Sequence, residues 1–130
     1  MYLLDTNTLI YFFKGMGNVA EILLAKSPKD ISIPSISLYE LEVGIAKSNS
    51  PKKRKKQLES LISRITVLPF ASKEAEVAAM IRADLENNGT PIGPYDNLIA
   101  GIALSSNAIL VTHNTKEFSR VKGLSLQDWF

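Results

Sequence analysis

Short apolar runs alternate with longer helical segments along the 130-residue chain. The short runs are mostly three or four residues long, and each predicts a buried strand. They lie at residues 2–4, 31–33, 65–68 and 109–111, with a weaker fifth candidate at 124–126. The segments between them predict helices at about 7–14, 18–26, 36–48, 51–63, 72–88 and 93–106. Strands separated by helices predict an α/β fold with a parallel sheet covered on both faces.

Length and composition exclude several classes of protein. The length is that of one domain, residues 1–130, and a hydrophobic content of 45% excludes a wholly disordered chain. Without cysteine, disulfide scaffolds and cysteine zinc sites are excluded as well. No apolar run is long enough to cross a bilayer, and the first residues lack a basic leader. We therefore expect a soluble cytoplasmic protein with no membrane partner.

The net charge is only +2, but positive charge is concentrated in one place. Five consecutive basic residues occupy the expected helix 51–63: Lys52, Lys53, Arg54, Lys55 and Lys56. Removing these five from the 15 basic residues leaves 10 against 13 acidic ones, a net charge of −3. Such a run is either a solvated helix face or a contact for the phosphates of a nucleic acid.

Acidic residues follow the predicted strands at the edge where open parallel sheets bind ligands. Asp5 comes directly after strand 2–4, and Glu40 and Asp96 lie in the first turns of helices that begin at the same edge. Each also has a structural interpretation: a helix cap for Asp5, a capping box with Ser37 for Glu40, and a helix-dipole contact for Asp96. The predicted topology nevertheless brings all three to one place.

Two further acids are less certain members of this group. Glu42 competes with Glu40, because two residues along a helix rotate by about 200° and only one of them can face a shared site. Glu117 follows strand 109–111, where a surface turn is the alternative interpretation. His113 is the only histidine, which excludes histidine-rich metal sites and makes a surface role the expectation.

Several carboxylates in one cleft repel one another and raise each other's pKa. A divalent cation removes that conflict. Ligands that are all oxygen favour Mg²⁺ or Mn²⁺ over zinc. Ions held in this way commonly serve phosphoryl chemistry.

Four motifs in fixed order carry a resemblance to a known family: Leu3-Leu4-Asp5-Thr6-Asn7, Glu40-Leu41-x-x-Gly44, Ile92-Gly93-Pro94-Tyr95-Asp96-x-Leu98-Ile99-Ala100 and Leu110-Val111-Thr112-x-Asn114. From end to end, the chain resembles a PIN-domain ribonuclease of the VapC toxin type. The resemblance implies a three-layer α/β/α sandwich with a central parallel sheet of four to five strands. It also implies a toxin from a VapBC-type toxin–antitoxin pair, namely a Mg²⁺- or Mn²⁺-dependent endoribonuclease that hydrolyses phosphodiester bonds in RNA.

The resemblance also implies roles for individual residues. Asp5, Glu40 and Asp96 fall on the family's principal acids, expected to bind the metal ion and act in catalysis, and the Glu-Leu-x-x-Gly match selects Glu40 over Glu42. Supporting polar positions are matched by Thr6, Asn7 and Thr112.

The chain departs from the family pattern at one position. Many PIN domains have a fourth acid where this chain has Asn114, and an amide adds no charge to a metal site. Glu117, three residues later, is the expected substitute.

The partners implied by the resemblance are a second copy, forming a homodimer, and a VapB-type antitoxin. Residues 9–13 are more apolar than one buried face requires, so either a partner helix covers part of them or the fold buries them on two sides. By analogy the expected substrate is a structured RNA such as initiator tRNA, with the basic run guiding its backbone.

Two other classes of function compete with this interpretation. A PIN-fold module that binds RNA or protein with little or no cleavage is favoured by the amide at Asn114. A receiver-like phosphoacceptor domain would need paired acids near the first strand and a late lysine at the sheet edge, and neither pattern is evident.

Overall fold

A five-stranded parallel sheet forms the centre of the protein, which the computed structural model describes over residues 1–130. Its strands are β1 (Tyr2–Leu4), β2 (Ile31–Pro34), β3 (Thr66–Leu68), β4 (Ile109–Val111) and β5 (Ser125–Gln127). They are ordered β3-β2-β1-β4-β5, so β1 is central and has β2 and β4 as its neighbours. The five predicted strands and their parallel arrangement are confirmed.

Seven α-helices and one short 3-10 helix connect the strands. The α-helices are α1 (Thr6–Lys14), α2 (Val19–Leu24), α3 (Ser35–Ala46), α4 (Pro51–Ile62), α5 (Ser72–Asn87), α6 (Pro94–Ser105) and α7 (Thr115–Phe118). The six longer ones match the predicted helices to within two residues at each end. The 3-10 helix (Pro28–Asp30) was not predicted, because one turn is too short to show an apolar period. None of the helices combines the length and apolar character that spanning a membrane requires.

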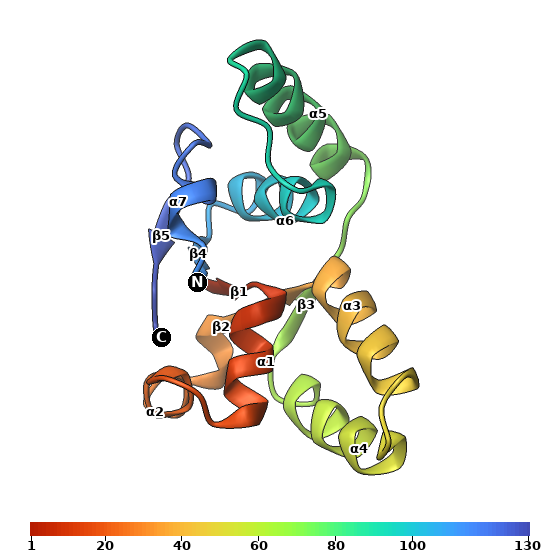
Figure 1. The fold of residues 1–130 in the computed structure, drawn as a ribbon. Helices are drawn as coiled ribbons and strands as arrows, with labels where there is room; N and C mark the ends of the chain where they lie inside the picture. Colours follow the sequence, from red (N-terminus) through yellow and green to blue (C-terminus); the bar gives the residue numbers. More distant parts are fainter.

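Helices cover both faces of the sheet, as Figure 1 shows, with α5 and α6 on one side and α1, α2 and α4 on the other. Each side has its own hydrophobic core. Adjacent residues of β1 enter different cores: Leu3 packs in the core that includes α5 and α6, and Leu4 packs in the core that includes α1, α2 and α4. Both leucines are fully buried. This alternation is the period of a strand, and it confirms the α/β/α sandwich.

Helices α5 and α6 approach each other closely at Gly101. A methyl group built on this glycine would lie 2.7 Å from Ala78 Cβ and 3.1 Å from Glu74 O, which is backbone. We expect Gly101→Ala to lower the free energy of unfolding by about 1–3 kcal/mol, because the two helices must move apart. Urea denaturation measures this, with Gly44→Ala as a control, since nothing lies within 4 Å of a methyl group there. Equal stability of the two variants would contradict the close approach.

Candidate active site

Asp5 connects β1 to α1 and is 5% exposed. Its Oδ1 accepts a hydrogen bond from Thr8 N at 2.9 Å, so the helix-cap interpretation of Asp5 is confirmed. The same turn is tied to β4, because Asp5 N and Thr8 Oγ1 both donate to Val111 O at 3.1 Å. The cap occupies one carboxylate oxygen, which places the carboxyl group at the edge of the sheet without excluding a second role.

Glu40 lies in the second turn of α3. The capping-box alternative is wrong, because the helix begins at Ser35 and Ser37 is therefore inside it. Glu40 Oε1 instead accepts a hydrogen bond from Thr6 Oγ1 at 2.7 Å, and Thr6 Oγ1 is also hydrogen-bonded to the buried Ser37 Oγ at 2.9 Å. These contacts join the first turn of α1 to α3.

Glu42 takes no part in this arrangement. It pairs with Lys55 from α4, so it faces a different neighbour from Glu40. The rotation of about 200° between the two glutamates accounts for the difference.

Asp96 lies in the first turn of α6 and is half-buried. Burial, above all, and then the negative charges of Asp5, Glu117 and Glu40, in that order, together raise its pKa to about 6. The four acids therefore interact electrostatically although β1, α3, α6 and α7 deliver them from separate parts of the chain. The structure thus brings the acids within electrostatic reach of one another, and a shared metal site stays a prediction.

The pKa of Asp5 is raised too, and the main cause is again burial. Hydrogen bonds from Thr112 and Thr8 oppose the increase, while the charge of Glu40 adds to it. Ionising both Asp5 and Asp96 thus has an electrostatic cost that a bound cation would offset.

Polar residues after β4 hold the last of the four acids. Thr112 is fully buried, and its Oγ1 accepts a hydrogen bond from Asn114 N at 3.0 Å. Asn114 Nδ2 in turn donates to Glu117 Oε2 at 2.7 Å, within the turn α7. The Asn114 amide therefore orients Glu117, and the substitution of Glu117 for a fourth acid stays a prediction.

Two of the remaining residues lie at the surface. Asn7 is exposed on the first turn of α1. His113 bonds to Asp128 at 2.9 Å and stacks on Phe130, with ring centroids 4.3 Å apart. This confirms the surface role expected for His113.

The donor set fits a hard divalent cation in its chemistry, because all four acids offer carboxylate oxygens. As placed, however, no three acidic or histidine side chains lie close enough together to hold one ion. Glu40 and Glu117 are each hydrogen-bonded to a neutral neighbour, Thr6 and Asn114.

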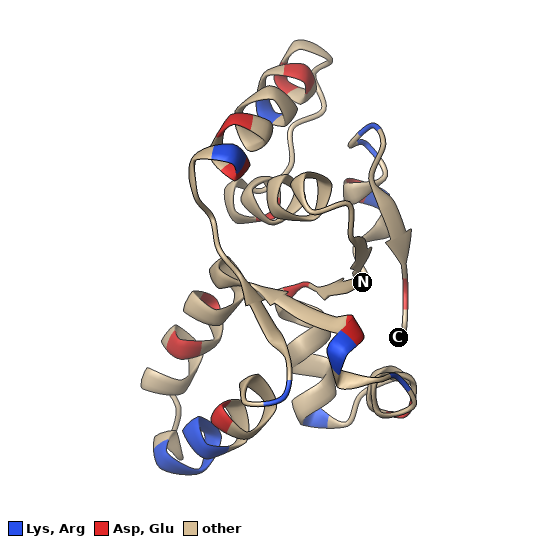
Figure 2. Cartoon of the chain, turned by 180° about the vertical axis from the view of Figure 1, so that it is seen from behind, with Lys and Arg blue, Asp and Glu red and all other residues tan.

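The basic run lies on α4, next to the acidic α3 (Figure 2). Arg54 lines a cavity of about 200 Å³ between α1, α3 and α4, together with Glu40 and Lys14. Lys55 is half-buried by its pair with Glu42, and the other members of the run, Lys52, Lys53, Arg54 and Lys56, are exposed. Positively charged Arg54 of α4 and the site acid Glu40 thus line the same cavity.

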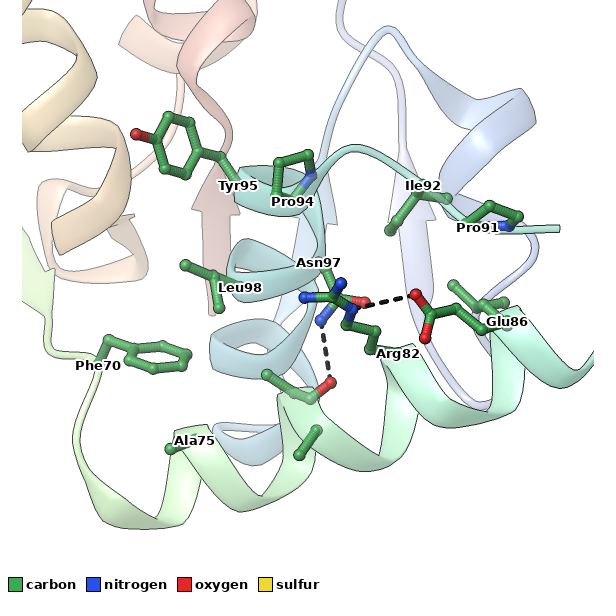
Figure 3. A pocket seen from close by; sticks show the side chains of 13 residues that line it. Phe70, Ala75, Arg82, Glu86, Pro91, Ile92, Pro94, Tyr95, Asn97 and Leu98 are labelled. Carbon is green, nitrogen blue, oxygen red and sulfur yellow. Dashed lines mark hydrogen bonds and ion pairs between the residues drawn. The ribbon is translucent and has the colours of Figure 1, made fainter.

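A larger cavity, of about 530 Å³, lies between α5 and α6 and does not contain any of the four acids (Figure 3). Its walls are mainly apolar, including Phe70, Leu85 and Ile92. Inside it Asn97 Nδ2 donates to Ala78 O at 2.9 Å, and at its rim Arg82 pairs with Glu86 at 3.2 Å. This cavity therefore contains none of the four acids, although its wall includes Tyr95, the residue before Asp96.

Sequence reasoning missed Thr8 and gave Ser37 the wrong role, although both help to orient the acids. Thr8 lies three residues after Asp5, the spacing of a helix cap and its partner, so its role could have been inferred. Ser37 is three residues before Glu40, and this spacing predicted that it caps the helix. The helix begins earlier, at Ser35, so Ser37 lies inside it. Only the position of the Thr6 hydroxyl, on another helix, reveals its partner.

The raised pKa of Asp96 predicts a pH-dependent stability. An acid with a folded-state pKa of about 6 against an ordinary 3.8 binds its proton more tightly when folded, so stability falls as pH rises between these values. With chelator present at pH 7.5, Asp96→Asn should therefore have a free energy of unfolding about 1 kcal/mol higher than that of wild type, a value that allows for solvent screening. Urea denaturation measures the difference. The difference should vanish below pH 4.

The matched control for this measurement is Asp84→Asn on α5, an exposed carboxylate. It should change the free energy of unfolding by less than about 0.5 kcal/mol at either pH. Equal behaviour of Asp96→Asn and Asp84→Asn would contradict the repulsion among the acids.

Comparison with known proteins places this geometry in a class. The family model described as PIN domain matches residues 2–124. The chain is 38% identical over 128 residues to the tRNA(fMet)-specific endonuclease VapC of Salmonella typhimurium, covering 98% of this chain and 97% of the relative. It is also 38% identical over 133 residues to Ribonuclease VapC2 of Rickettsia felis, covering 99% and 98%.

Solved structures agree with these relatives. A chain in the crystal structure of DNA-bound VapBC from Salmonella typhimurium superimposes with a TM-score of 0.92 at 38% identity, over 99% of this chain and 98% of that one. A chain of VapBC2 from Rickettsia felis bound to a promoter DNA fragment gives 0.91 at 35% identity, with the same coverage. The chain belongs to the VapC family of PIN-domain ribonucleases, which confirms the resemblance inferred from its motifs.

Proposed function

We propose that this VapC ribonuclease depends on Mg²⁺ or Mn²⁺, and that Asp5, Glu40 and Asp96 hold the ion. The observation that carries the proposal is the placement of the acids: Asp5 follows the central strand β1, and α3 and α6 supply Glu40 and Asp96 close enough for their charges to raise the pKa of Asp96. Bound at such a site, the ion would screen phosphate charge and acidify a water molecule for attack on a phosphodiester.

The chain's own residues support this chemistry by orienting the acids. Thr6 holds Glu40, and Asn114 holds Glu117. Thr112 Oγ1 accepts a hydrogen bond from Asn114 N. Thr112 also opposes the increase in the pKa of Asp5, which favours the ionised form that binds cations.

We further propose that the substrate is a structured RNA such as initiator tRNA, as the name of the Salmonella relative says of that enzyme. The exposed lysines and Arg54 of α4 supply positive charge for the RNA backbone near Glu40. The positive charge on α4 would thus attract the RNA backbone toward this side of the protein, while the acids themselves have no basic side chain among them.

The proposed partners are a VapB-type antitoxin and a second copy of the chain. Structural neighbours are VapBC complexes, which supports the antitoxin. Phe12 and Phe13 of α1 are half-buried and line two cavities toward α2 and α4, so this helix keeps apolar surface for a partner. The cytoplasm remains the expected compartment.

The test is a cleavage assay with purified protein free of antitoxin, using initiator and elongator tRNA transcripts. We expect cleavage of the initiator tRNA with Mg²⁺ or Mn²⁺, and none with excess chelator. Parallel purification of Asp5→Asn controls for contaminating nucleases. Cleavage that continues at full rate in chelator would contradict the metal, and equal cleavage of both tRNAs would contradict the substrate.

A second function, binding of RNA or protein without cleavage, is favoured by Asn114 and by the spread of the acids, no three of which hold a common site as placed. The same assay discriminates the two. A protein that binds tRNA but cleaves no RNA with any divalent ion would support the binding module.

A further inference from the structure

Two exposed tyrosines form a pair beside the acidic site. Tyr39 on α3 is 55% exposed and Tyr95 on α6 is 45% exposed. Their ring centroids are 6.0 Å apart and the planes meet at 78°, an edge-to-face contact. In this geometry the ring that presents its edge keeps both of its faces free of its partner.

The pair is placed by the same helical turns that deliver the acids. Tyr39 immediately precedes Glu40, and Tyr95 immediately precedes Asp96. The Tyr39 hydroxyl, above all, and the charge of Glu40 raise the pKa of Tyr95, so this hydroxyl lies within electrostatic reach of a site acid. Figure 3 shows the Tyr95 side chain pointing away from Arg82 and Glu86, which lie on α5.

We propose that Tyr39 and Tyr95 form a stacking platform for an unpaired base of the RNA next to the bond that is cleaved. This inference rests on the proposed function. It specifies the substrate further: the RNA must present at least one unstacked nucleotide at the site.

The charge distribution explains why such a platform is needed. Four acids repel the phosphates of the substrate, and the positive charge lies on α4 rather than among them. A base stacked on an aromatic ring gains free energy without charge, and it does so whatever the identity of the base. The tyrosines can thus hold a nucleotide where the backbone alone would be repelled.

The exposure of Tyr39 and Tyr95 argues against a purely structural role for these side chains. Rings that serve only to join two helices are normally covered, as Phe118 is, with none of its surface exposed. Here about half of each ring residue stays open to solvent beside the acids.

The test measures binding of a fluorescent single-stranded RNA to the Asp5→Asn protein in Mg²⁺, so that cleavage does not interfere. Adding Tyr39→Leu or Tyr95→Leu should weaken binding by about 5- to 150-fold. The matched changes Tyr39→Phe and Tyr95→Phe keep the ring and should stay within about threefold. Met80→Ala, an exposed apolar residue of α5, is the control for nonspecific apolar contact.

A second arm removes one base at a time from the RNA. In the Asp5→Asn protein, removing the base at one position should weaken binding by the same factor as a tyrosine-to-leucine change. Once Tyr39 or Tyr95 is replaced by leucine, removing that base should no longer change the affinity. A structural role for the tyrosines would not change the dependence on a particular base. Failure of the wild type to cleave RNA overturns the proposed function. If the wild type cleaves RNA but the leucine variants bind RNA with unchanged affinity, the stacking platform is overturned.

Discussion

Asp5→Asn is expected to lower RNA cleavage at least a hundredfold, about 3 kcal/mol of transition-state stabilisation, without unfolding the protein. The substitution removes one of the charges that hold the proposed cation. Asparagine caps a helix about as well as aspartate, so α1 keeps its first hydrogen bond. Single-turnover cleavage of tRNA measures the loss, and urea denaturation checks that the fold is intact.

Asp30→Asn provides the matched control for this experiment. Asp30 is an exposed aspartate in the 3-10 helix before β2, and its substitution should leave the cleavage rate within about twofold. Wild-type cleavage by a stably folded Asp5→Asn protein would show that the acid caps a helix and does nothing more.

Phe118→Ala is expected to lower the free energy of unfolding by about 3–5 kcal/mol. Phe118 is fully buried, and it anchors the turn α7 in the core formed with α5 and α6. Its removal leaves a cavity and also frees Glu117, one residue earlier, from its position at the site. Urea denaturation at neutral pH gives the value.

Phe118→Leu separates the cavity from the loss of apolar character. Leucine fills much of the same volume, so this variant should lose less than half as much stability as Phe118→Ala. Losses below 1 kcal/mol for both variants would mean that α7 is not anchored by this ring.

Most of the fold was predictable because its strands are short apolar runs with clear ends. The run Leu3-Leu4 followed by Asp5 marks both a buried strand and the start of a helix, and the apolar run Ile109–Val111 marks the buried strand β4. The turn α7 and the 3-10 helix were harder, because their formation depends on tertiary contacts such as the burial of Phe118. A four-residue helix has no period to detect.

The sequence allowed the acids of the candidate site to be identified, but not the contacts that orient them. Topology brings Asp5, Glu40 and Asp96 together, and that follows from strand order. The hydrogen bond from Thr6 to Glu40 joins residues 34 positions apart, and no local pattern encodes it. The Tyr39–Tyr95 contact depends on how α3 and α6 pack, which the sequence alone does not reveal.

The central position of β1 has a consequence for synthesis on the ribosome. One of its two neighbours, β4, is translated long after it, since Thr8 bonds to a carbonyl 103 residues downstream. A nascent chain lacking β4 has no partner for that side of β1 and no α7 to supply Glu117. The enzyme therefore cannot place Glu117 beside the other three acids until β4 and α7 have both left the ribosome.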